Sequence, residues 1–470
     1  MLDGWVLVVG GGVVETDRER HGQVIGDAGA RLGSGAVQGL AFVYRWNSGT
    51  STYDLHSTLT PFSTAAACDN INNAAVMDSF GFKVVADGNF IAVSAVDPTV
   101  SNPPGNGEVF VFEYDSGTDT YLCSARLWDV YEASVSPSVD NNNLGFGKTL
   151  DLHANAMVVG GQDPGSASSR YRLFVYSGTA WEHVPDADRG VSADAACVYD
   201  HSSGSTAVTI VSMDRETSNY FLYLETWDGT TFEFERLNYD VGIGTGDAAL
   251  LLKCTADRVF FWAGTVLNSD SRGIRPQSVL TLPMYAPSHS FSGTEWDIDP
   301  LEVILPGNHE ATQPANDEFG RLFDVTRDGS ILVASYPGAT AYGNAAALGG
   351  GRGQVLADAG SLHWFSKDVP VDWKDRVNMQ YGEVTYLFPR EYVSANTGSV
   401  KGGNAVATSG VRTASTVLSQ GVVLVYDKSF CTTQCVTRTT SAFTASCGGA
   451  SQCWCGHVFE EGDCVSQEFW

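Results

Sequence analysis

Cysteine is the residue type whose number and spacing in this chain predict chemistry most directly. Of ten cysteines, the last 40 residues hold Cys431, Cys435, Cys447, Cys453, Cys455 and Cys464. So short a segment cannot bury enough apolar surface to fold alone, so we expect disulfide bonds and an oxidising compartment. A zinc site is the alternative, but only His457 is nearby and the thiols lack paired C-x2-C spacing.

Motifs for catalysis are weak. Gly145–Thr149 (GFGKT) looks like part of a phosphate loop, but such a loop needs glycine at position 142, which is Asn. Gly349–Gly353 is a glycine loop without a following lysine, the nine histidines form no H-E-x-x-H motif, and no G-x-S-x-G elbow occurs. We therefore predict no enzyme, no catalytic residue and no cofactor-binding residue.

A repeated turn indicates which secondary-structure elements make up the chain. Ser-Gly-Thr or Asp-Gly-Thr precedes an aromatic residue five times, at Ser48–Tyr53, Ser116–Tyr121, Ser177–Trp181, Asp228–Phe232 and Ser292–Trp296. The copies lie about 50 to 70 residues apart, which suits a four-stranded sheet with long loops. The period predicts an all-β chain folded as a β-propeller.

The finer repeat divides the chain into units. A Phe-Gly pair, a buried strand, a tight turn and two further strands recur with the expected period. We expect a seven-bladed β-propeller over residues 1–430 and a small disulfide-rich module over 431–470. The units are predicted near 5–60, 78–127, 143–184, 190–237, 241–302, 317–375 and 378–428.

The repeat resembles the FG-GAP repeat of the integrin α-subunit propeller. The residues that carry the resemblance include Phe80, Gly81, Phe146, Gly147, Phe319, Gly320, Pro98, Pro164 and Pro337. Glycine beside phenylalanine allows close approach of the first strand while the ring packs between sheets, and proline ends the second strand. Four further cysteines are then predicted to pair as Cys68–Cys123 and Cys197–Cys254, each pair joining adjacent units.

Two departures from this family limit what the resemblance implies. Integrin-type blades bind calcium through several turn oxygens, but the turns Ala86–Gly88, His153–Asn155 and Arg327–Gly329 are short. We expect no cofactor, with calcium in a looser loop site as the alternative. The first unit also starts without a first strand and the last without an outer one, so we expect a truncated chain or a strand supplied from the tail or a neighbouring molecule.

The tail resembles an EGF-like module. The resemblance rests on Cys453-Trp454-Cys455 followed by Cys464, with Gly462 two residues before it. It implies the pairs Cys431–Cys447, Cys435–Cys453 and Cys455–Cys464, among the fifteen connectivities that six cysteines allow.

Charge and hydropathy exclude some partners. The net charge is −27, which disfavours nucleic acid and anionic membranes, and no run of 18 apolar residues predicts a membrane span. Met1–Gly10 lacks a secretory signal and is expected to form a strand; no N-linked glycosylation sequon is found, whereas O-linked sugars stay open.

These observations favour an extracellular structural or adhesive protein. We expect protein partners, through self-assembly or binding to matrix or filament components, with glycans as further candidates. The alternatives are a lectin-like or receptor-like ligand-binding propeller and a secreted hydrolase, because propellers can assemble carboxylate pairs from distant loops. Nothing in the sequence locates such a pair.

Overall fold

The fold was analysed in a computed structural model of the 470-residue chain. The residues that the structure describes are 5–10, 22–27, 31–32, 36–37, 39–47, 49–50, 52–61, 68, 80–96, 107–127, 146–162, 169–185, 195–200, 208–216, 219–240, 251–255, 258–263, 266–267, 274–275, 278–283, 302–304, 319–320, 322–336, 341–342, 355–356, 361–366, 382–387, 402–408, 412–417, 422–427, 436–439, 442–445, 457–460 and 463–466.

Within these ranges every named element is a strand, and most strands belong to four-stranded antiparallel sheets. Sheet 1 consists of β1 (Trp5–Gly10), β2 (Gly22–Asp27), β5 (Leu40–Asn47) and β6 (Thr52–Leu59). Sheet 2 consists of β7 (Phe80–Asp87), β8 (Phe90–Ala95), β9 (Glu108–Asp115) and β10 (Thr120–Leu127). Sheet 3 consists of β11 (Thr149–His153), β12 (Ala156–Gln162), β13 (Ser169–Tyr176) and β14 (Trp181–His183).

The later sheets follow the same plan. Sheet 4 consists of β15 (Ala195–Asp200), β16 (Val208–Glu216), β17 (Asn219–Trp227) and β18 (Phe232–Asp240). Sheet 5 consists of β19 (Leu252–Cys254), β20 (Arg258–Ala263), β23 (Ser278–Pro283) and β24 (Glu302–Ile304). Sheet 6 consists of β25 (Phe323–Val325), β26 (Ile331–Tyr336), β29 (Ser361–Ser366) and β30 (Gly382–Leu387). Sheet 7 has three strands, β31 (Gly402–Thr408), β32 (Arg412–Val417) and β33 (Val422–Asp427).

The remaining strands are short. Three two-stranded hairpins pair β3 (Arg31–Leu32) with β4 (Ala36–Val37), β21 (Val266–Leu267) with β22 (Ile274–Arg275), and β27 (Ala341–Tyr342) with β28 (Val355–Leu356). The C-terminal region forms a separate sheet from β34 (Val436–Thr439), β35 (Ala442–Ala445), β36 (His457–Glu460) and β37 (Asp463–Ser466).

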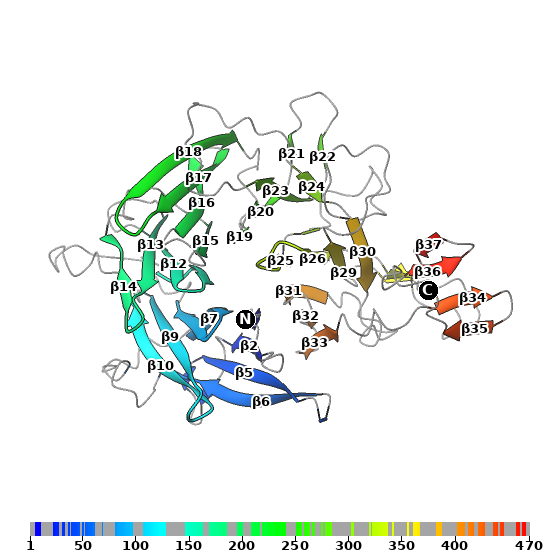
Figure 1. Ribbon diagram of the computed structural model, residues 1–470, viewed down its shortest axis with the longest axis horizontal. Coiled ribbons are helices and arrows are strands. Elements are labelled where there is room, and N and C mark those ends of the chain that lie inside the picture. The colour runs from blue at the N-terminus through cyan, green and yellow to red at the C-terminus, as the bar shows by residue number, and fades with distance from the viewer. Residues whose placement is uncertain are drawn as a thin grey trace. The chain divides into compact units, whose positions relative to one another are not determined.

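The chain divides into two compact units, one of residues 1–261 and 283–298 and one of 262–282 and 299–470. In the first unit the first strands of successive sheets contact one another in the order β1, β7, β11, β15 and β19. The outer strands β6, β10 and β18 lie at the opposite edges of their sheets (Figure 1). In the second unit β31 contacts β25 and β26. This arrangement is β-propeller-like.

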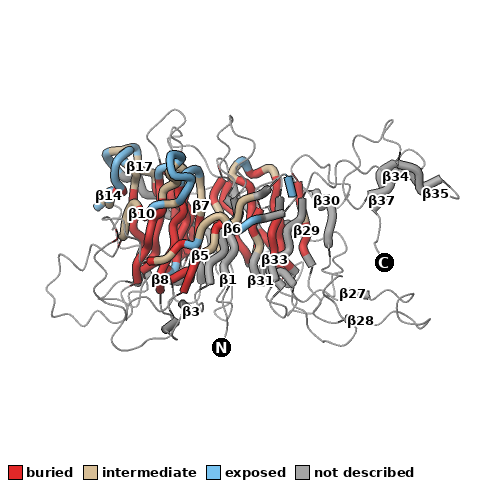
Figure 2. The backbone as a smooth tube through the Cα atoms, turned by 90° about the horizontal axis from the view of Figure 1, so that it is seen from below, coloured by how far each residue is buried: buried red, intermediate tan, exposed pale blue. Residues whose placement is uncertain are grey.

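Apolar side chains from adjacent sheets form the core. Alternate residues of a strand face opposite sides of its sheet, so Val84 packs with sheet 1 while Val85 packs with Leu150 and Leu152 of sheet 3. A third cluster joins sheets 3 and 4. Figure 2 shows the strands of these sheets mostly buried and the hairpin turns near β10 exposed.

The Phe-Gly pairs lie at the start of the first strand of sheet 2 and just before the first strands of sheets 3 and 6. Phe80, Phe146 and Phe319 are buried, and the glycines after them have φ between +73° and +94°. A Cβ at Gly147 would lie 2.8 Å from the Ser94 Cβ, so glycine permits the close approach of sheet 3 to sheet 2. A second glycine, before the third strand, was not predicted: a Cβ at Gly107 would lie 2.0 Å from the Phe146 carbonyl oxygen.

Two expectations about the units are wrong: a missing strand in the first and the start of the seventh. Sheet 1 has four strands, with β1 against β7, so the expectation of a missing first strand fails. Strand β30 was expected to start the seventh unit, but it pairs with β29 and is the outer strand of sheet 6. Sequence period alone cannot assign such a strand, because the pairing depends on the length of the connecting loop.

The two predicted disulfides outside the tail are present. Cys68–Cys123 and Cys197–Cys254 have Cα–Cα distances of 6.2 and 5.5 Å. The tail pairings and Pro98, Pro164 and Pro337 lie outside the residues whose side chains are described. No helix among the described residues is long and apolar enough to cross a membrane.

Candidate functional site

Three charged side chains lie on the first strands of sheets 2, 3 and 5, and the charges of two of them act on the third. They are Lys83 on β7, Asp151 on β11 and Lys253 on β19, here called the inner cluster. Asp151 is buried and both lysines are half-buried. Three of the seven lysines in the chain, Lys83, Lys148 and Lys253, lie on or directly before first strands of the first unit.

The backbone at Lys83 is held by the neighbouring strand. The β7–β8 register shifts between Phe80 and Lys83, after Gly81 at φ +89°. Ser94 on β8 fills this irregularity: its Oγ accepts a hydrogen bond from the Lys83 N–H at 3.0 Å and donates one to the Lys83 carbonyl at 3.4 Å. Lys83 and Val85 share a strand face, and Val85 packs against sheet 3. The lysine is thus directed toward β11.

The surroundings of Lys83 change its acidity. Burial, and then the charge of Lys253, lower the pKa of Lys83 from 10.5 to about 8, while Asp151 opposes the change. At pH 8 about half of Lys83 is therefore a neutral amine that can accept a proton or attack an electrophile. Such a group is a candidate for catalysis.

Asp151 is held in place by the next sheet. Its Oδ2 accepts a hydrogen bond from the Val198 N–H at 3.0 Å. The same device recurs in the second unit, where Asp324 Oδ2 accepts from the Thr408 N–H at 2.8 Å. Asp151 thus links strands of two sheets, and its charge also acts on Lys83. Its structural role fixes its position in the inner cluster.

Polar groups also link the hairpin ends of these strands. The Ala154 N–H donates to Asp87 Oδ2 at 2.8 Å, and the Asp200 N–H donates to His153 Nδ1 at 2.9 Å. Asp87 Oδ1 accepts from the Gly88 N–H. Among the described residues no group of three His, Cys, Asp or Glu side chains is placed to hold a metal ion. In the short turns considered for calcium, the carboxylates of Asp87 and Asp328 accept hydrogen bonds from backbone N–H groups.

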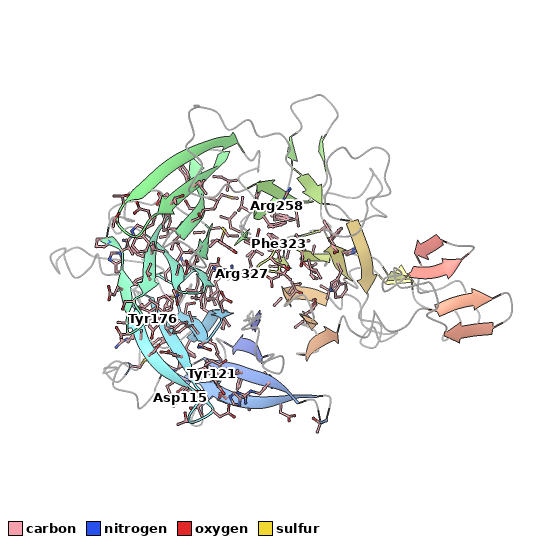
Figure 3. All side chains as sticks on the ribbon, in the orientation of Figure 1. Asp115, Tyr121, Tyr176, Arg258, Phe323 and Arg327 are labelled. Carbon is pink, nitrogen blue, oxygen red and sulfur yellow. A yellow bond between two sulfur atoms is a disulfide. The ribbon has the colours of Figure 1, made fainter. Side chains whose placement is uncertain are left out.

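A second charged group, here called the outer cluster, joins the outer parts of sheets 1 and 2. Arg45 donates to both carboxylate oxygens of Asp119, at 3.0 and 2.8 Å, and to His56 Nε2 at 3.0 Å. The Tyr114 hydroxyl donates to Asp119 Oδ1 at 2.6 Å. These bonds hold the pKa of Asp119 well below its usual range. Figure 3 labels Asp115 and Tyr121, which lie beside this cluster at the outer hairpin of sheet 2.

The sequence analysis predicted no residue of the inner cluster as a functional residue. The repeat residues Phe80, Phe146 and Phe319 are buried and structural, as their pattern suggested. A usable signal was present in the lysines: Lys83 stands between Phe82 and Val84, and Lys253 between Leu252 and Cys254. A lysine in an apolar strand is energetically costly and therefore deserves a functional explanation.

Comparisons with known proteins find solved structures that match most of the chain at low TM-scores. No protein family and no curated protein matches the sequence. A candidate 6-phosphogluconolactonase from Bacteroides fragilis has 13% identity over 90% of this chain and 90% of its own, with a TM-score of 0.40. Sqt1 of Saccharomyces cerevisiae has 9% identity over 91% and 84%, with a TM-score of 0.38. A periplasmic gluconolactonase of Pseudomonas aeruginosa has 11% identity over 77% and 92%, with a TM-score of 0.35.

These comparisons contradict the predicted function. Two of the three proteins are named as lactonases, whereas we predicted an extracellular structural or adhesive protein without enzymatic activity. That prediction is wrong. At such low TM-scores, no activity can be transferred from these proteins, so the reaction has to be inferred from the side chains of this chain.

Proposed function

We propose that this protein is an enzyme that hydrolyses a small, negatively charged ester or lactone at the inner cluster. The observation that carries the proposal is Lys83, half-buried on β7, with a pKa lowered to about 8 by burial and then by the charge of Lys253. Like charges are brought together at a cost, and an anionic ligand offsets that cost.

The two lysines take different roles in this reaction. Lys253 supplies the positive charge that holds the substrate anion and stabilises the oxyanion. The neutral amine of Lys83 accepts a proton from water as the water oxygen bonds to the carbonyl carbon. The bond between that carbon and the leaving oxygen then breaks, and Lys83 returns the proton to the leaving alkoxide. The products are a carboxylic acid and an alcohol.

Asp151 is a positioning residue in this scheme. Its hydrogen bond from Val198 fixes the carboxylate, and its charge favours the protonated form of Lys83. Without it the amine would lose its proton at a lower pH. The carboxylate thus sets the pH range in which Lys83 can cycle between base and acid.

For the architecture we propose that sheets 1 to 7 are blades of FG-GAP type, followed by an EGF-like module over residues 431–470. The equivalent burial of Phe80, Phe146 and Phe319 supports a common repeat. The two disulfides support an extracellular or other oxidising location. Calcium in a loop and binding to glycans or protein partners are compatible with this architecture.

The test of the enzyme proposal is hydrolysis of gluconolactone and 6-phosphogluconolactone, followed by proton release in weakly buffered solution. We expect Lys83→Met to lower kcat/KM by about 100-fold, the scale of general-base catalysis. The wild-type rate should rise with a midpoint near pH 8. Lys148→Met is the matched control, because Lys148 is exposed beside β11 and should leave the rate unchanged. A wild-type chain inactive on both probes, or a fully active Lys83→Met variant, would reject the proposal.

A further inference from the structure

We propose that the Asp87–Gly88 turn of sheet 2 is a site of spontaneous aspartate isomerisation, which releases a link between sheets 2 and 3. The inference is independent of the inner cluster and of the proposed function. Asp-Gly pairs stand at Asp3, Asp87, Asp228 and Asp328, and the last three lie within the described residues. Glycine after aspartate leaves the main-chain nitrogen unhindered, because it has no Cβ. Asp87 is half-buried and the other two are exposed, so exposure alone favours the other two.

The Gly88 nitrogen is placed to react with the Asp87 side chain. The Gly88 N–H donates to Asp87 Oδ1 at 3.1 Å, and Asp87 Oδ2 accepts from the Ala154 N–H of sheet 3 at 2.8 Å. Because both oxygens are held, the carboxyl group stays next to the nitrogen with which it must bond. Gly88 is exposed, and a Cβ at this position would meet nothing within 4 Å, so water can reach the turn.

Asp228 is held away from this reaction by its own turn. Its Oδ1 accepts hydrogen bonds from the Thr231 N–H at 2.7 Å and the Thr230 N–H at 2.8 Å, which lie beyond Gly229. These bonds, that of Thr231 first, hold the pKa of Asp228 well below its usual range. Since the protonated carboxyl group is the form that loses water, a smaller share of Asp228 can react.

At Asp328 the nitrogen itself is engaged. The Gly329 N–H donates to the Thr326 carbonyl at 2.8 Å, and Gly329 is buried. The Asp328 carboxylate accepts from the Ser330 N–H at 3.0 Å, one residue beyond the nitrogen with which it would have to bond. Of the three turns, the one at Asp87 therefore has the geometry that isomerisation requires.

The reaction balances with water as its only co-reactant. The Gly88 nitrogen bonds to Cγ of the protonated Asp87 carboxyl group, and the hydroxyl group leaves with the nitrogen-bound proton as water. The product is a cyclic imide. Water then adds to the main-chain carbonyl carbon of Asp87, the bond from that carbon to nitrogen breaks, and the nitrogen takes up the proton. The main chain now runs through the former side-chain carbon, as isoaspartate.

This change affects the junction between sheets 2 and 3. Isoaspartate lengthens the main chain after residue 87 and moves the free carboxylate, so the hydrogen bond from the Ala154 N–H is lost. The neighbouring Asn155 N–H donates to Asp200 Oδ2 of sheet 4 at 3.3 Å. The turn between β11 and β12 thus keeps a link to sheet 4 and loses its link to Asp87 of sheet 2.

The test compares the three turns in one molecule. The full chain is aged at mildly acidic pH, folded or unfolded in urea, and isoaspartate is mapped by enzymatic methylation and fragmentation mass spectrometry. In the folded chain we expect Asp87 to isomerise at least about 10-fold faster than Asp228 and Asp328, and in urea all three within about threefold of one another. An equal rate at Asp228 or Asp328 in the folded chain, or the same order of rates in urea, would overturn the proposal.

Hydrogen exchange at the Ala154 amide tests the release of the link. Its exchange rate should rise by about 5-fold in aged wild-type protein that contains isoaspartate at position 87, the scale of one lost hydrogen bond. Asp87→Glu should abolish both the isoaspartate and this rise, because the longer side chain does not close the same ring. Asp228→Glu is the matched control and should age like the wild type. Unchanged exchange in isomerised protein, or the same rise in aged Asp87→Glu, would overturn the proposed release.

Discussion

The inner and outer clusters both combine basic and acidic side chains, but their roles differ. In the outer cluster Arg45 and Asp119 form a bidentate pair, with a tyrosine and a histidine completing the hydrogen bonds. In the inner cluster burial, and then the charge of Lys253, lower the pKa of Lys83. Opposite charges thus hold two sheets together in the outer cluster, whereas burial and a like charge make Lys83 a reactive amine in the inner one. The contrast distinguishes a structural ion pair from a candidate site more clearly than residue type does.

The largest effect on stability is expected where the sheets approach most closely. Gly107→Ala places a Cβ 2.0 Å from the Phe146 carbonyl oxygen at a φ of +65°, so we expect a loss of about 3 kcal/mol or more. Gly178→Ala, at an outer turn with a φ of +92° and open space around it, should cost about 1 kcal/mol. Chemical denaturation measures both. Equal losses would show that the junction between sheets is less constrained than its geometry indicates.

Asp151 and Asp119 provide the next comparison. Asp151→Ala leaves the buried Val198 N–H without its acceptor, and we expect a loss of about 2 kcal/mol in unfolding free energy. Asp151→Asn keeps an acceptor and should fold, but it should move the midpoint of the activity profile below pH 8. Asp119→Asn should leave that profile unchanged. An unmoved midpoint in Asp151→Asn would exclude Asp151 from the electrostatics of the site.

The alkaline stability of the wild type tests the state of Lys83. The pKa of Lys83 is about 8 in the folded chain and 10.5 for an ordinary lysine, so between these values the unfolded chain binds more protons. Stability should therefore rise from pH 8 to 10.5 relative to Lys83→Met. Thermal unfolding of both proteins across this range gives the difference, and parallel curves would contradict the lowered pKa.

The smallest effect is expected at the outer cluster in acid. Burial, and then the charge of Arg45, lower the pKa of His56 below 6.5, while Asp119 opposes them. His56 therefore disfavours the folded state once the pH falls from 6.5 through its folded pKa. His56→Gln should lose less stability over this range than the wild type. A His56→Gln variant that loses more stability in acid than the wild type would contradict the lowered pKa of His56.

The sequence was sufficient for the repeating elements. The Phe-Gly pairs mark the first strands because a buried ring and a positive-φ glycine are both needed there. The disulfides Cys68–Cys123 and Cys197–Cys254 followed from the assignment of cysteines to adjacent units. Strand β30 was misassigned because its partner β29 lies beyond a loop that the period does not constrain.

The candidate site could not be predicted in the same way. Lys83, Asp151 and Lys253 are separated by 68 and 102 residues (151 − 83 and 253 − 151), and the apolar neighbours of each lysine do not show that the three residues belong to one site. Their approach depends on how first strands of different sheets meet, which is a property of the assembled unit. Chemistry in a repeat protein thus arises at positions where the repeats differ.

The two disulfides also determine how this chain would respond to mechanical force. They close segments with sequence separations of 55 and 57 residues, which cannot lengthen while the bonds are intact. At roughly 3.5 Å per residue, the fully stretched chain would be shorter by about 390 Å than its reduced form. Under tension, the oxidised molecule would therefore unfold in fewer or shorter extension steps. Its redox state would determine the length of the fully stretched chain.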